Sequence, residues 1–256
     1  MLQQIFLAVL FGLGAVTAAP FADDELGSLV VNGTDSNIEN YPYMVSVRRI
    51  TGAHMCGGTL LNPYWVLTAA HCLMNSPASY YRIQHSSTVI SSDAVVNVTI
   101  AAETIRHPNY DPEDSHLHDI GLIRLSEPVY VNRYAIIPHQ FADVAHETPS
   151  RLLGWGLEQT GGTVQETLQE VDLIVFSDEE CRHRHDDMIY PSFICGGVPE
   201  GGRGQCSGDS GGPLLVNGIE VGIVSWSVKP CTVAPYPGVY TQVSYYREWI
   251  RQFTSV

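Results

Sequence analysis

The residue best placed for chemistry in this sequence is a serine set among glycines. Ser210 lies in residues 205–213, which read QCSGDSGGP. A serine is a weak nucleophile until a positioned base takes its proton, and that base needs a carboxylate to hold its tautomer. The glycines let the backbone turn so that the N–H groups of Gly208 and Ser210 converge on one oxygen. Such an oxyanion hole stabilises the transition state by roughly 2.7–4 kcal/mol per donor.

Two short motifs supply a base and a carboxylate for this serine. His71 stands in residues 68–72, which read TAAHC, and Asp119 leads directly into an apolar strand expected at 120–125. A lone histidine is more often a surface or packed residue, and an aspartate at a strand edge usually forms a turn. An acid at the start of an apolar strand is nevertheless expected to be buried. There it would orient His71 and stabilise its imidazolium.

The order of these residues along the chain separates two kinds of hydrolase. The α/β-hydrolases share the Gly-x-Ser-x-Gly pattern but need their histidine after the serine. All ten histidines here precede Ser210, and the last is His185, which disfavours an esterase or lipase. The order His71, Asp119, Ser210 is that of chymotrypsin. Over residues 30–256 the chain resembles the trypsin/chymotrypsin family of secreted serine proteases, which implies that these three residues form a catalytic triad.

Short runs of strand-forming residues predict an all-β fold. The chain has 256 residues, 45% of them hydrophobic, with 23 glycines and 15 prolines, enough for one large domain or two small ones. No βαβ alternation is present, which argues against a parallel sheet. Strands are expected at 43–48, 95–100, 120–125, 169–175, 213–216 and 221–226. The resemblance implies two antiparallel six-stranded Greek-key barrels, at about 30–135 and 145–256, with the catalytic cleft between them.

Two helices and one connection complete the expected fold. Residues 177–180 read SDEE, a capping box with Ser177 as the N-cap and Glu180 three residues later. Apolar residues recur at helical spacing between 246 and 253, after Ser244 as a candidate cap. This C-terminal helix is expected to pack on the body of the protein. The irregular stretch 132–151 is expected to join the two barrels.

The N-terminus predicts secretion and a precursor form. Residues 5–19 are apolar and end in small residues, so 1–19 is interpreted as a cleaved signal peptide and 20–29 as an activation propeptide. A buried N-terminal strand is the alternative interpretation. Residues 30–33 read VVNG and resemble the new N-terminus that cleavage creates in this family. The freed amine of Val30 would pair with Asp209 and thereby position Gly208. Because no basic residue precedes Arg48, cleavage after Leu29 is expected from a leucine-favouring protease, or from this protease itself.

The six cysteines agree with an extracellular protein. An even number of cysteines in a secreted chain favours disulfides, although six cysteines allow 15 pairings. A zinc site is the rival interpretation, but the sequence contains no C-x-x-C or C-x-x-H cluster to support it. The resemblance implies a pattern similar to that of arthropod members of the family, with the pairs Cys56–Cys72, Cys181–Cys195 and Cys206–Cys231.

Charge and sequons narrow the range of partners. The formal net charge is −14 and Lys229 is the only lysine, so nucleic acid and anionic membranes are poor partners. Polypeptide substrates, protein protease inhibitors and an activating protease are the expected partners of a monomer without a cofactor. Asn32 and Asn97 each stand in an N-glycosylation sequon.

The specificity pocket implied by the resemblance is neutral. Trypsin has an aspartate at the pocket floor, where this chain has Gly204. Gly238 leaves one wall open, while Ser227 replaces the usual glycine and narrows the entrance. A Lys or Arg at P1, the substrate residue before the scissile bond, would be buried unpaired at a cost of several kcal/mol. Large apolar P1 residues (Phe, Tyr, Leu, Met) are expected, with an elastase-like preference for small residues as the alternative. Arg203, next to the floor, would change this expectation if it pointed inward.

Further histidines and one serine receive narrower interpretations. Ser225 is expected to support the Asp119 carboxylate. His54 matches a family position linked to the inactive precursor, and a simply packed histidine is an equal alternative. His116 and His118 lie just before the acid and could suggest a metal site, but no third ligand has suitable spacing, so no metal site is expected.

Two other segments are not expected to form a functional site. His183 and His185 are expected in solvent. Residues 82–88 contain too few carboxylates to bind calcium, which needs about six oxygen ligands.

The leading hypothesis is a secreted serine endopeptidase made as a zymogen. The alternative from another class is a catalytically silent homologue that binds proteins.

Overall fold

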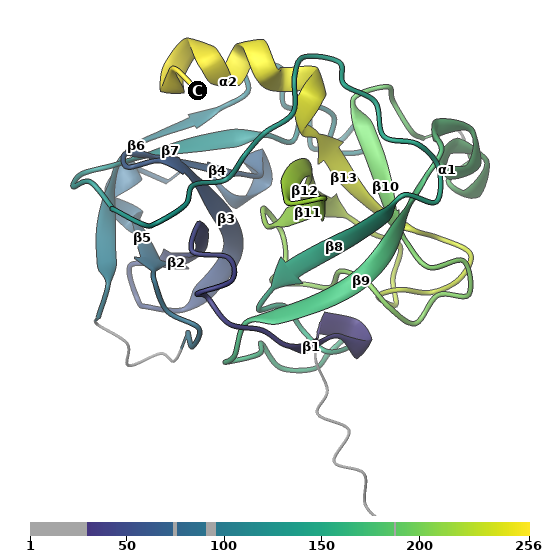
Figure 1. Ribbon diagram of the computed structural model, residues 1–256, viewed down its shortest axis with the longest axis horizontal. Coiled ribbons are helices and arrows are strands. Elements are labelled where there is room, and N and C mark those ends of the chain that lie inside the picture. Colours follow the sequence, from purple (N-terminus) through teal and green to yellow (C-terminus); the bar gives the residue numbers. More distant parts are fainter. Residues whose placement is uncertain (1–29, 74–75, 91–95, 187) are drawn as a thin grey trace, which may run out of the picture.

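A computed structural model describes residues 30–73, 76–90, 96–186 and 188–256, and it shows two antiparallel β-barrels lying side by side (Figure 1). The first closes in the order β2-β3-β4-β7-β6-β5. Its strands are β2 (Met44–Arg49), β3 (His54–Asn62), β4 (Trp65–Thr68), β5 (Tyr81–His85), β6 (Val98–Arg106) and β7 (Gly121–Leu125).

The second barrel closes because β8 pairs with both β11 and β9. The order around it is β9-β10-β13-β12-β11-β8, and the short β1 (Thr34–Asp35) adds to β9. Its strands are β8 (Pro149–Gly154), β9 (Gln169–Phe176), β10 (Phe193–Gly197), β11 (Pro213–Val216), β12 (Ile219–Trp226) and β13 (Gly238–Gln242). The expected architecture of two six-stranded barrels is therefore confirmed.

Each of the six expected strand segments overlaps a strand, and six further barrel strands were not expected. Among these, β3 and β10 carry paired glycines, which lower strand propensity. The barrel needs some of them: a Cβ added to Gly58 would lie 2.9 Å from the carbonyl oxygen of Leu67 on β4. Close approach of neighbouring strands thus selects glycine where local propensity argues against a strand.

The helix expected after Ser177 is present as α1 (Asp178–Arg184). The Ser177 side chain caps it by accepting a hydrogen bond from the backbone N–H of Glu180, at 3.1 Å. The reciprocal half of the capping box is absent, because the Glu180 carboxylate accepts from Arg184 one turn later instead. The charge-assisted bond to arginine is the stronger of the two options.

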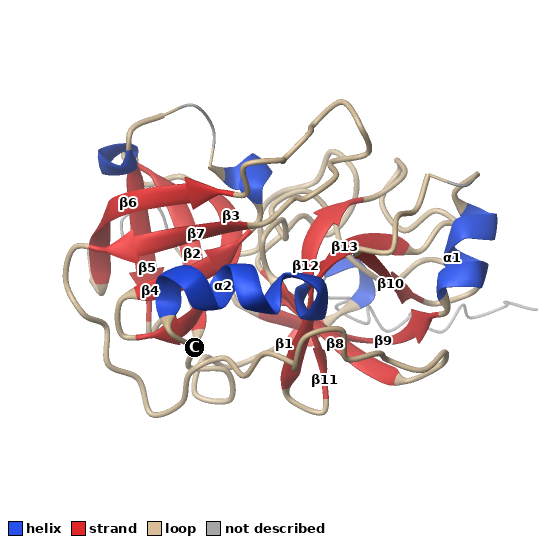
Figure 2. Ribbon diagram, turned by 90° about the horizontal axis from the view of Figure 1, so that it is seen from above, coloured by secondary structure: helices blue, strands red, loops and turns tan. Residues whose placement is uncertain are grey.

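The C-terminal helix α2 (Arg247–Thr254) begins later than expected. Ser244 is not its cap, since it lies inside a preceding 3₁₀ turn, η4 (Val243–Tyr246). The apolar face of this region packs on the first barrel, where Tyr246 and Ile250 are buried in the same cluster as the strand residues of that barrel. The side chain of Asn62 donates to the Thr254 carbonyl at 3.0 Å. The helix therefore fastens the end of the chain to the opposite barrel (Figure 2).

Residues 126–148 connect the barrels without forming a strand of either one.

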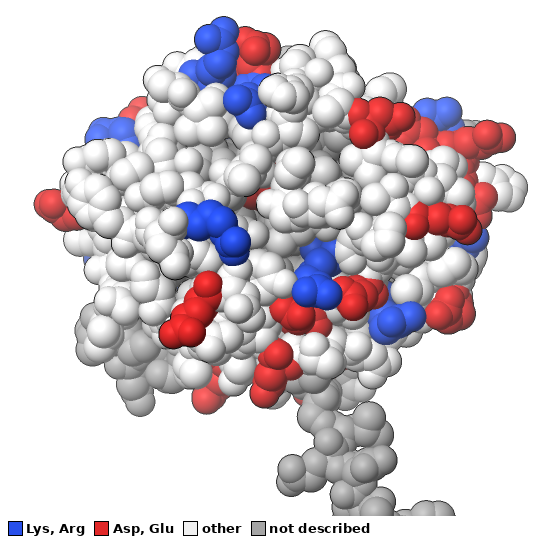
Figure 3. Space-filling view, in the orientation of Figure 1, with Lys and Arg blue, Asp and Glu red and all other residues white. Residues whose placement is uncertain are grey.

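On the face shown in Figure 3, acidic and basic side chains are scattered over a largely neutral surface. No helix in the described residues is long and apolar enough to cross a membrane.

Candidate active site

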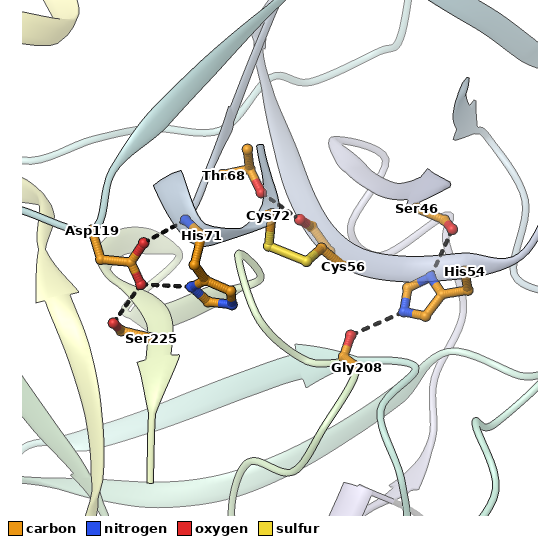
Figure 4. The surroundings of a disulfide bond; sticks show 10 residues. Ser46, His54, Cys56, Thr68, His71, Cys72, Asp119, Gly208 and Ser225 are labelled. Carbon is orange, nitrogen blue, oxygen red and sulfur yellow. Dashed lines mark hydrogen bonds and ion pairs between the residues drawn. A yellow bond between two sulfur atoms is a disulfide. The ribbon is translucent and has the colours of Figure 1, made fainter. Parts of the chain in front are cut away.

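The centre of the candidate site is a histidine fixed by a buried aspartate (Figure 4). His71 lies in the 3₁₀ turn η2 (Ala70–Cys72) after β4, and Asp119 precedes β7. The His71 Nδ1 lies 2.7 Å from Asp119 Oδ2, and the His71 backbone N–H donates to Asp119 Oδ1 at 2.8 Å. In the neutral ring, the proton on Nδ1 is donated to the carboxylate and the other ring nitrogen, Nε2, is unprotonated. That tautomer is the one a general base requires.

The Asp119 carboxylate is fully buried and held from the second barrel. Ser225 Oγ donates to Asp119 Oδ2 at 2.6 Å, and Thr241 Oγ1 donates to the Asp119 carbonyl at 2.8 Å. Burial alone raises the pKa of Asp119, but the charge and hydrogen bonds of His71 and the hydrogen bond from Ser225 outweigh it and hold the pKa below its usual value. Burial alone lowers the pKa of His71, and the neighbouring carboxylate reverses this and holds the pKa above 6.5. The pair therefore stabilises an imidazolium beside a carboxylate.

Ser210 comes from the second barrel and is fastened against the turn that carries His71. Its carbonyl accepts from Gly57 N–H at 2.8 Å, and the neighbouring Cys56 forms a disulfide with Cys72, the residue after His71. Gly211, at φ 78°, lies so close to the first barrel that an added Cβ would be 2.2 Å from Thr68 Oγ1. A glycine is required here by both its backbone angle and the close approach.

Within the described residues, no hydrogen bond joins the Ser210 side chain to His71. In ligand-free enzymes such contacts are often long and tighten when substrate binds. The backbone N–H groups of Gly208 and Ser210 likewise have no hydrogen-bond acceptor within that part of the chain. Both are therefore available to an oxygen atom placed beside Ser210.

A second histidine holds the Gly208 peptide in place. His54 Nε2 lies 2.9 Å from the Gly208 carbonyl, and its Nδ1 lies 2.7 Å from Ser46 Oγ (Figure 4). Burial lowers the pKa of His54 to about 4, so the ring is neutral near pH 7, with Nε2–H donating to the carbonyl. His54 is thus a packed histidine in this structure, and it anchors the loop that carries the candidate oxyanion donors.

Asp209 occupies a cradle formed by two glycines. Its carboxylate is fully buried and accepts from Gly156 N–H at 2.8 Å and Cys206 N–H at 2.9 Å. A Cβ added to Gly154 or Gly156 would lie 2.0 Å or 2.4 Å, respectively, from carboxylate atoms of Asp209. Burial raises the pKa of Asp209 to about 7. Val30 is also fully buried, among apolar residues of the second barrel, whereas Leu29 lies outside the described residues.

The residues predicted to form the specificity pocket lie together. Gly204, Ser227 and Gly238 line one pocket. Its other lining residues are Gly197, Val198, Gly201, Arg203, Gln205, Thr232, Tyr236 and Pro237. None of its described lining residues carries a carboxylate. The guanidinium of Arg203 lies 3.6 Å from Glu200, and both side chains are well exposed. Arg203 therefore directs its charge toward solvent.

The sequence did not single out Gln205, which also lines this pocket. Its Nε2 donates to the Trp226 carbonyl at 2.5 Å, and a Cβ on Gly238 would lie 2.9 Å from its Cδ. The space left by Gly238 is thus partly filled by the Gln205 side chain. The only sequence signal was its position beside Gly204 and before Cys206.

The expectation that His185 is in solvent is wrong. The residue is 1% exposed, its Nε2 lies 2.9 Å from the Pro237 carbonyl, and its ring packs edge-on against Trp226. Pro237 lines the pocket, so His185 supports a pocket wall from behind. Helix α1 ends just before His185 and turns it inward, which a run of charged residues did not indicate.

The structure contains three disulfides, and they are the pairs implied by the resemblance. Cys56–Cys72 links β3 to the turn of His71, and Cys181–Cys195 links α1 to β10. Cys206–Cys231 joins the chain on two sides of the pocket. The last pair joins the residue before Ser207 to the loop after Ser227. Both the nucleophile loop and a pocket wall are therefore covalently braced.

Comparisons with known proteins agree with this geometry. A sequence model of the Trypsin family matches residues 30–250. The chain is 38% identical over 248 residues to Serine protease 1 of Rattus norvegicus and 36% identical over 248 residues to Serine protease 1 of Homo sapiens. It is 36% identical over 247 residues to Anionic trypsin of Canis lupus familiaris. Each match covers 96% of this chain and 96% of the relative. This chain therefore belongs to the trypsin family and is a serine endopeptidase.

Proposed function

We propose that His71, Asp119 and Ser210 are the catalytic triad of a secreted endopeptidase that cleaves after large apolar residues. The observation that carries the proposal is the 2.7 Å contact of His71 Nδ1 with a fully buried carboxylate. With Nδ1–H so engaged, Nε2 takes the proton of Ser210 as the hydroxyl attacks the scissile carbonyl. His71 then protonates the leaving amine, and water releases the acyl group by the same route. Ser225 positions Asp119.

The N–H groups of Gly208 and Ser210 would stabilise the oxyanion formed in this attack. Both donors are unused among the described residues, and His54 holds the Gly208 carbonyl, which belongs to the peptide group between the two donors. The N–H of that peptide group, from Asp209, donates to the Cys206 carbonyl, so the peptide plane that links the two donors is fixed at both ends. A donor that is already oriented needs no reorganisation when charge develops on the substrate.

A neutral pocket supports the proposed specificity. A Lys or Arg at P1 would meet no carboxylate among the described lining residues, and an unpaired buried charge is strongly disfavoured. Gly204 has space above it, because an added Cβ would contact only Thr232, at 3.3 Å. The Gln205 side chain beside Gly238 favours the second candidate, an elastase-like preference for smaller apolar residues.

A panel of peptide amides that differ only at P1 tests this specificity. The expected order of kcat/KM places Phe, Tyr, Leu and Met above Lys and Arg. A maximum at Ala or Val would support the elastase-like candidate. A higher value for Arg than for all apolar residues would contradict the neutral pocket.

A serine-directed phosphonofluoridate separates the protease from a catalytically silent homologue. An active triad is expected to give covalent labelling of Ser210, detected by mass spectrometry of the modified peptide. The His71→Ala variant is the matched control, because it keeps the serine but lacks the base. Equal labelling of the two proteins, or none of either, would contradict the triad.

The chain is also proposed to be made as a secreted zymogen, with a signal peptide at 1–19 and a propeptide at 20–29. Two observations support activation at the Leu29–Val30 bond. Val30 is fully buried, as is the Asp209 carboxylate, which accepts from two backbone N–H groups. Burial raises the pKa of Asp209 to about 7, so a cation beside it would stabilise its charged form. The freed Val30 amine would supply that cation. Loss of one partner of a buried pair typically costs about 3–5 kcal/mol, enough to leave the precursor mostly inactive.

N-terminal sequencing tests this activation scheme. The Ser210→Ala precursor would be incubated with trypsin, chymotrypsin or the active enzyme, since the variant cannot cleave itself. Cleavage by the active enzyme to a chain beginning at Val30 is expected, because the neutral pocket accepts leucine. An active form that begins elsewhere would contradict the scheme, whereas cleavage by chymotrypsin alone would remove only self-activation.

Partners and modification follow from the same proposal. Polypeptide substrates and protein inhibitors would occupy the cleft of a monomeric enzyme without a cofactor. Asn97 is exposed, and within the described residues its amide makes only a long contact of 3.4 Å with the Ser86 carbonyl. The Asn32 amide donates to the Gly202 carbonyl at 2.7 Å. We therefore propose Asn97 over Asn32 as the glycosylated residue.

A further inference from the structure

A third histidine faces the base of the triad. The rings of His71 and His116 lie 5.6 Å apart between centroids, at 65° to one another. One ligand atom from each of His71, His116 and Asp119 can be chosen so that all lie within 4.8 Å of one another. The sequence pointed to His116 and His118 as a pair that lacked a third ligand. The structure separates that pair and places His116 beside His71 instead.

The nitrogen atoms that could bind an ion are identified by the hydrogen bonds of the two rings. His71 Nδ1 is engaged by Asp119, and His116 Nδ1 lies 2.9 Å from the hydroxyl of Tyr110. Within the described residues, neither Nε2 takes part in a hydrogen bond. An imidazole whose far nitrogen donates to a carboxylate or hydroxyl oxygen is the usual arrangement of a metal-ligating histidine, since that contact fixes the ring and its tautomer.

The loop that carries His116 is held in one conformation. Ser115, His116 and His118 all adopt left-handed backbone angles, with φ between 50° and 60°. Leu117 N–H donates to the Asp114 carbonyl at 2.8 Å, and the Asp114 carboxylate accepts from Tyr190 of the second barrel at 2.7 Å. His118 points elsewhere, with its Nδ1 2.8 Å from the Tyr246 hydroxyl. The approach of His116 to His71 is therefore set by the fold of the loop.

Two other groups of possible metal ligands in the described residues each contain one histidine and two cysteines, and neither can bind a metal in the same way. They are Cys56, His71 and Cys72, and Cys181, His185 and Cys195. In each group the two cysteines form a disulfide with one another. A disulfide sulfur is not a thiolate, and it is the thiolate that ligates a metal.

We propose that Nε2 of His71 and Nε2 of His116 bind a zinc ion, and that the ion inhibits the protease reversibly. Imidazole nitrogens suit zinc and copper, with Zn–N distances of about 2.0–2.1 Å. Two nitrogens on one tetrahedral zinc are then roughly 3.3 Å apart, a separation that two imidazole rings with centroids 5.6 Å apart can reach by rotation about their side-chain bonds. Water completes the coordination. Asp119 stays the outer-shell partner, because its oxygens already accept from His71 and Ser225.

Inhibition follows from the identity of the occupied atom. The lone pair that zinc takes on His71 Nε2 is the one that would accept the proton of Ser210, so the bound enzyme has no general base. This inference rests on the proposed triad. It adds that the enzyme is inhibited where the zinc concentration exceeds the dissociation constant of this site. Activity recovers when zinc is removed.

Metal binding is measured first in a chain that cannot turn over substrate. Zinc is titrated calorimetrically into the Ser210→Ala chain, and into the same chain carrying His116→Ala or His118→Ala. Loss of an outer-shell partner alone costs about 10–100-fold in metal affinity, so His116→Ala is expected to weaken zinc binding at least about tenfold. His118→Ala is the matched control from the same loop and should keep the site. Equal affinity in all three chains would overturn the proposal.

Inhibition is then measured in the active enzyme as the ratio of amidase activity with and without zinc. At a zinc concentration that leaves about one tenth of wild-type activity, a tenfold weaker site leaves about half. His116→Ala is therefore expected to keep at least about half of its own activity, His118→Ala about one tenth, and a chelator should restore both. Equal inhibition of His116→Ala and wild type would overturn the proposal. Absence of turnover without zinc would contradict the proposed protease function instead, and the calorimetry would still decide the metal site.

Discussion

A buried glutamate between the barrels makes the stability of this protein depend on pH. Glu220 on β12 is fully buried, and Thr59 Oγ1 on β3 donates to its Oε2 at 2.6 Å. The second oxygen, Oε1, has no hydrogen-bond partner among the described residues. Burial raises the pKa of Glu220 to about 8, and the Thr59 hydrogen bond offsets only part of this effect. The carboxyl is therefore mostly protonated at neutral pH.

The sign and size of the effect follow from proton linkage. The folded protein holds this proton up to a pH of about 8, whereas an unfolded glutamate releases it near 4.5. Between these values the folded state binds more protons, so the free energy of unfolding falls as pH rises. A pKa difference of about 3.5 corresponds to at most about 5 kcal/mol. This contribution is fully present below pH 4.5 and lost once the pH has passed 8.

The test compares Glu220→Gln with its parent at pH 5 and pH 9. Both proteins carry Ser210→Ala to prevent self-digestion, and the free energy of unfolding is taken from urea titrations followed by tryptophan fluorescence with disulfides intact. Glutamine keeps an acceptor for Thr59 but does not titrate, so the variant should be similar at pH 5 and more stable by several kcal/mol at pH 9. Glu127→Gln, an exposed control, should track the parent. Parallel curves for Glu220→Gln and its parent would refute the reasoning.

Four further predictions concern the site. Ser210→Ala and His71→Ala are each expected to lose about 10⁶-fold in kcat on a peptide amide, because a triad acts as one unit; a folded Ser210→Ala variant that keeps more than about one hundredth of the activity would contradict the triad. The raised pKa of His71 places the acid limb of the pH profile of kcat/KM above pH 6.5, since the protonated ring cannot act as a base, and a midpoint below that value would argue against His71. Gly156→Ala is expected to cost at least about tenfold in kcat/KM, because the added Cβ would lie 2.4 Å from the Asp209 carboxylate and displace it; unchanged kinetics would show that the cradle is not needed. Gly204→Asp is not expected to give efficient cleavage after Arg, because position 204 has a φ of 144° that side chains rarely adopt; wild-type kcat/KM on an Arg substrate would contradict this.

The sequence by itself determined the features that depend on residue type and short spacing. The order His71, Asp119, Ser210 already excluded hydrolases that need a histidine after the serine. Short runs of strand-forming residues marked the six expected strands, and Ser177 marked the start of α1. The strand and helix-cap signals are local, because each comes from residues that share a strand or a turn, whereas the order of the three site residues needs only their positions along the chain.

Only the tertiary structure decided which distant groups meet. The glycines of β3 and β10 argued locally against strands, and barrel closure favours them because neighbouring backbones come close. The inward turn of His185, the packing of Gln205 under Gly238, and the Thr59–Glu220 contact join segments far apart in the chain. Of two histidines on one loop, left-handed backbone angles send one toward His71 and the other toward Tyr246. Side-chain direction in such places is set by packing between elements, which local sequence patterns do not encode.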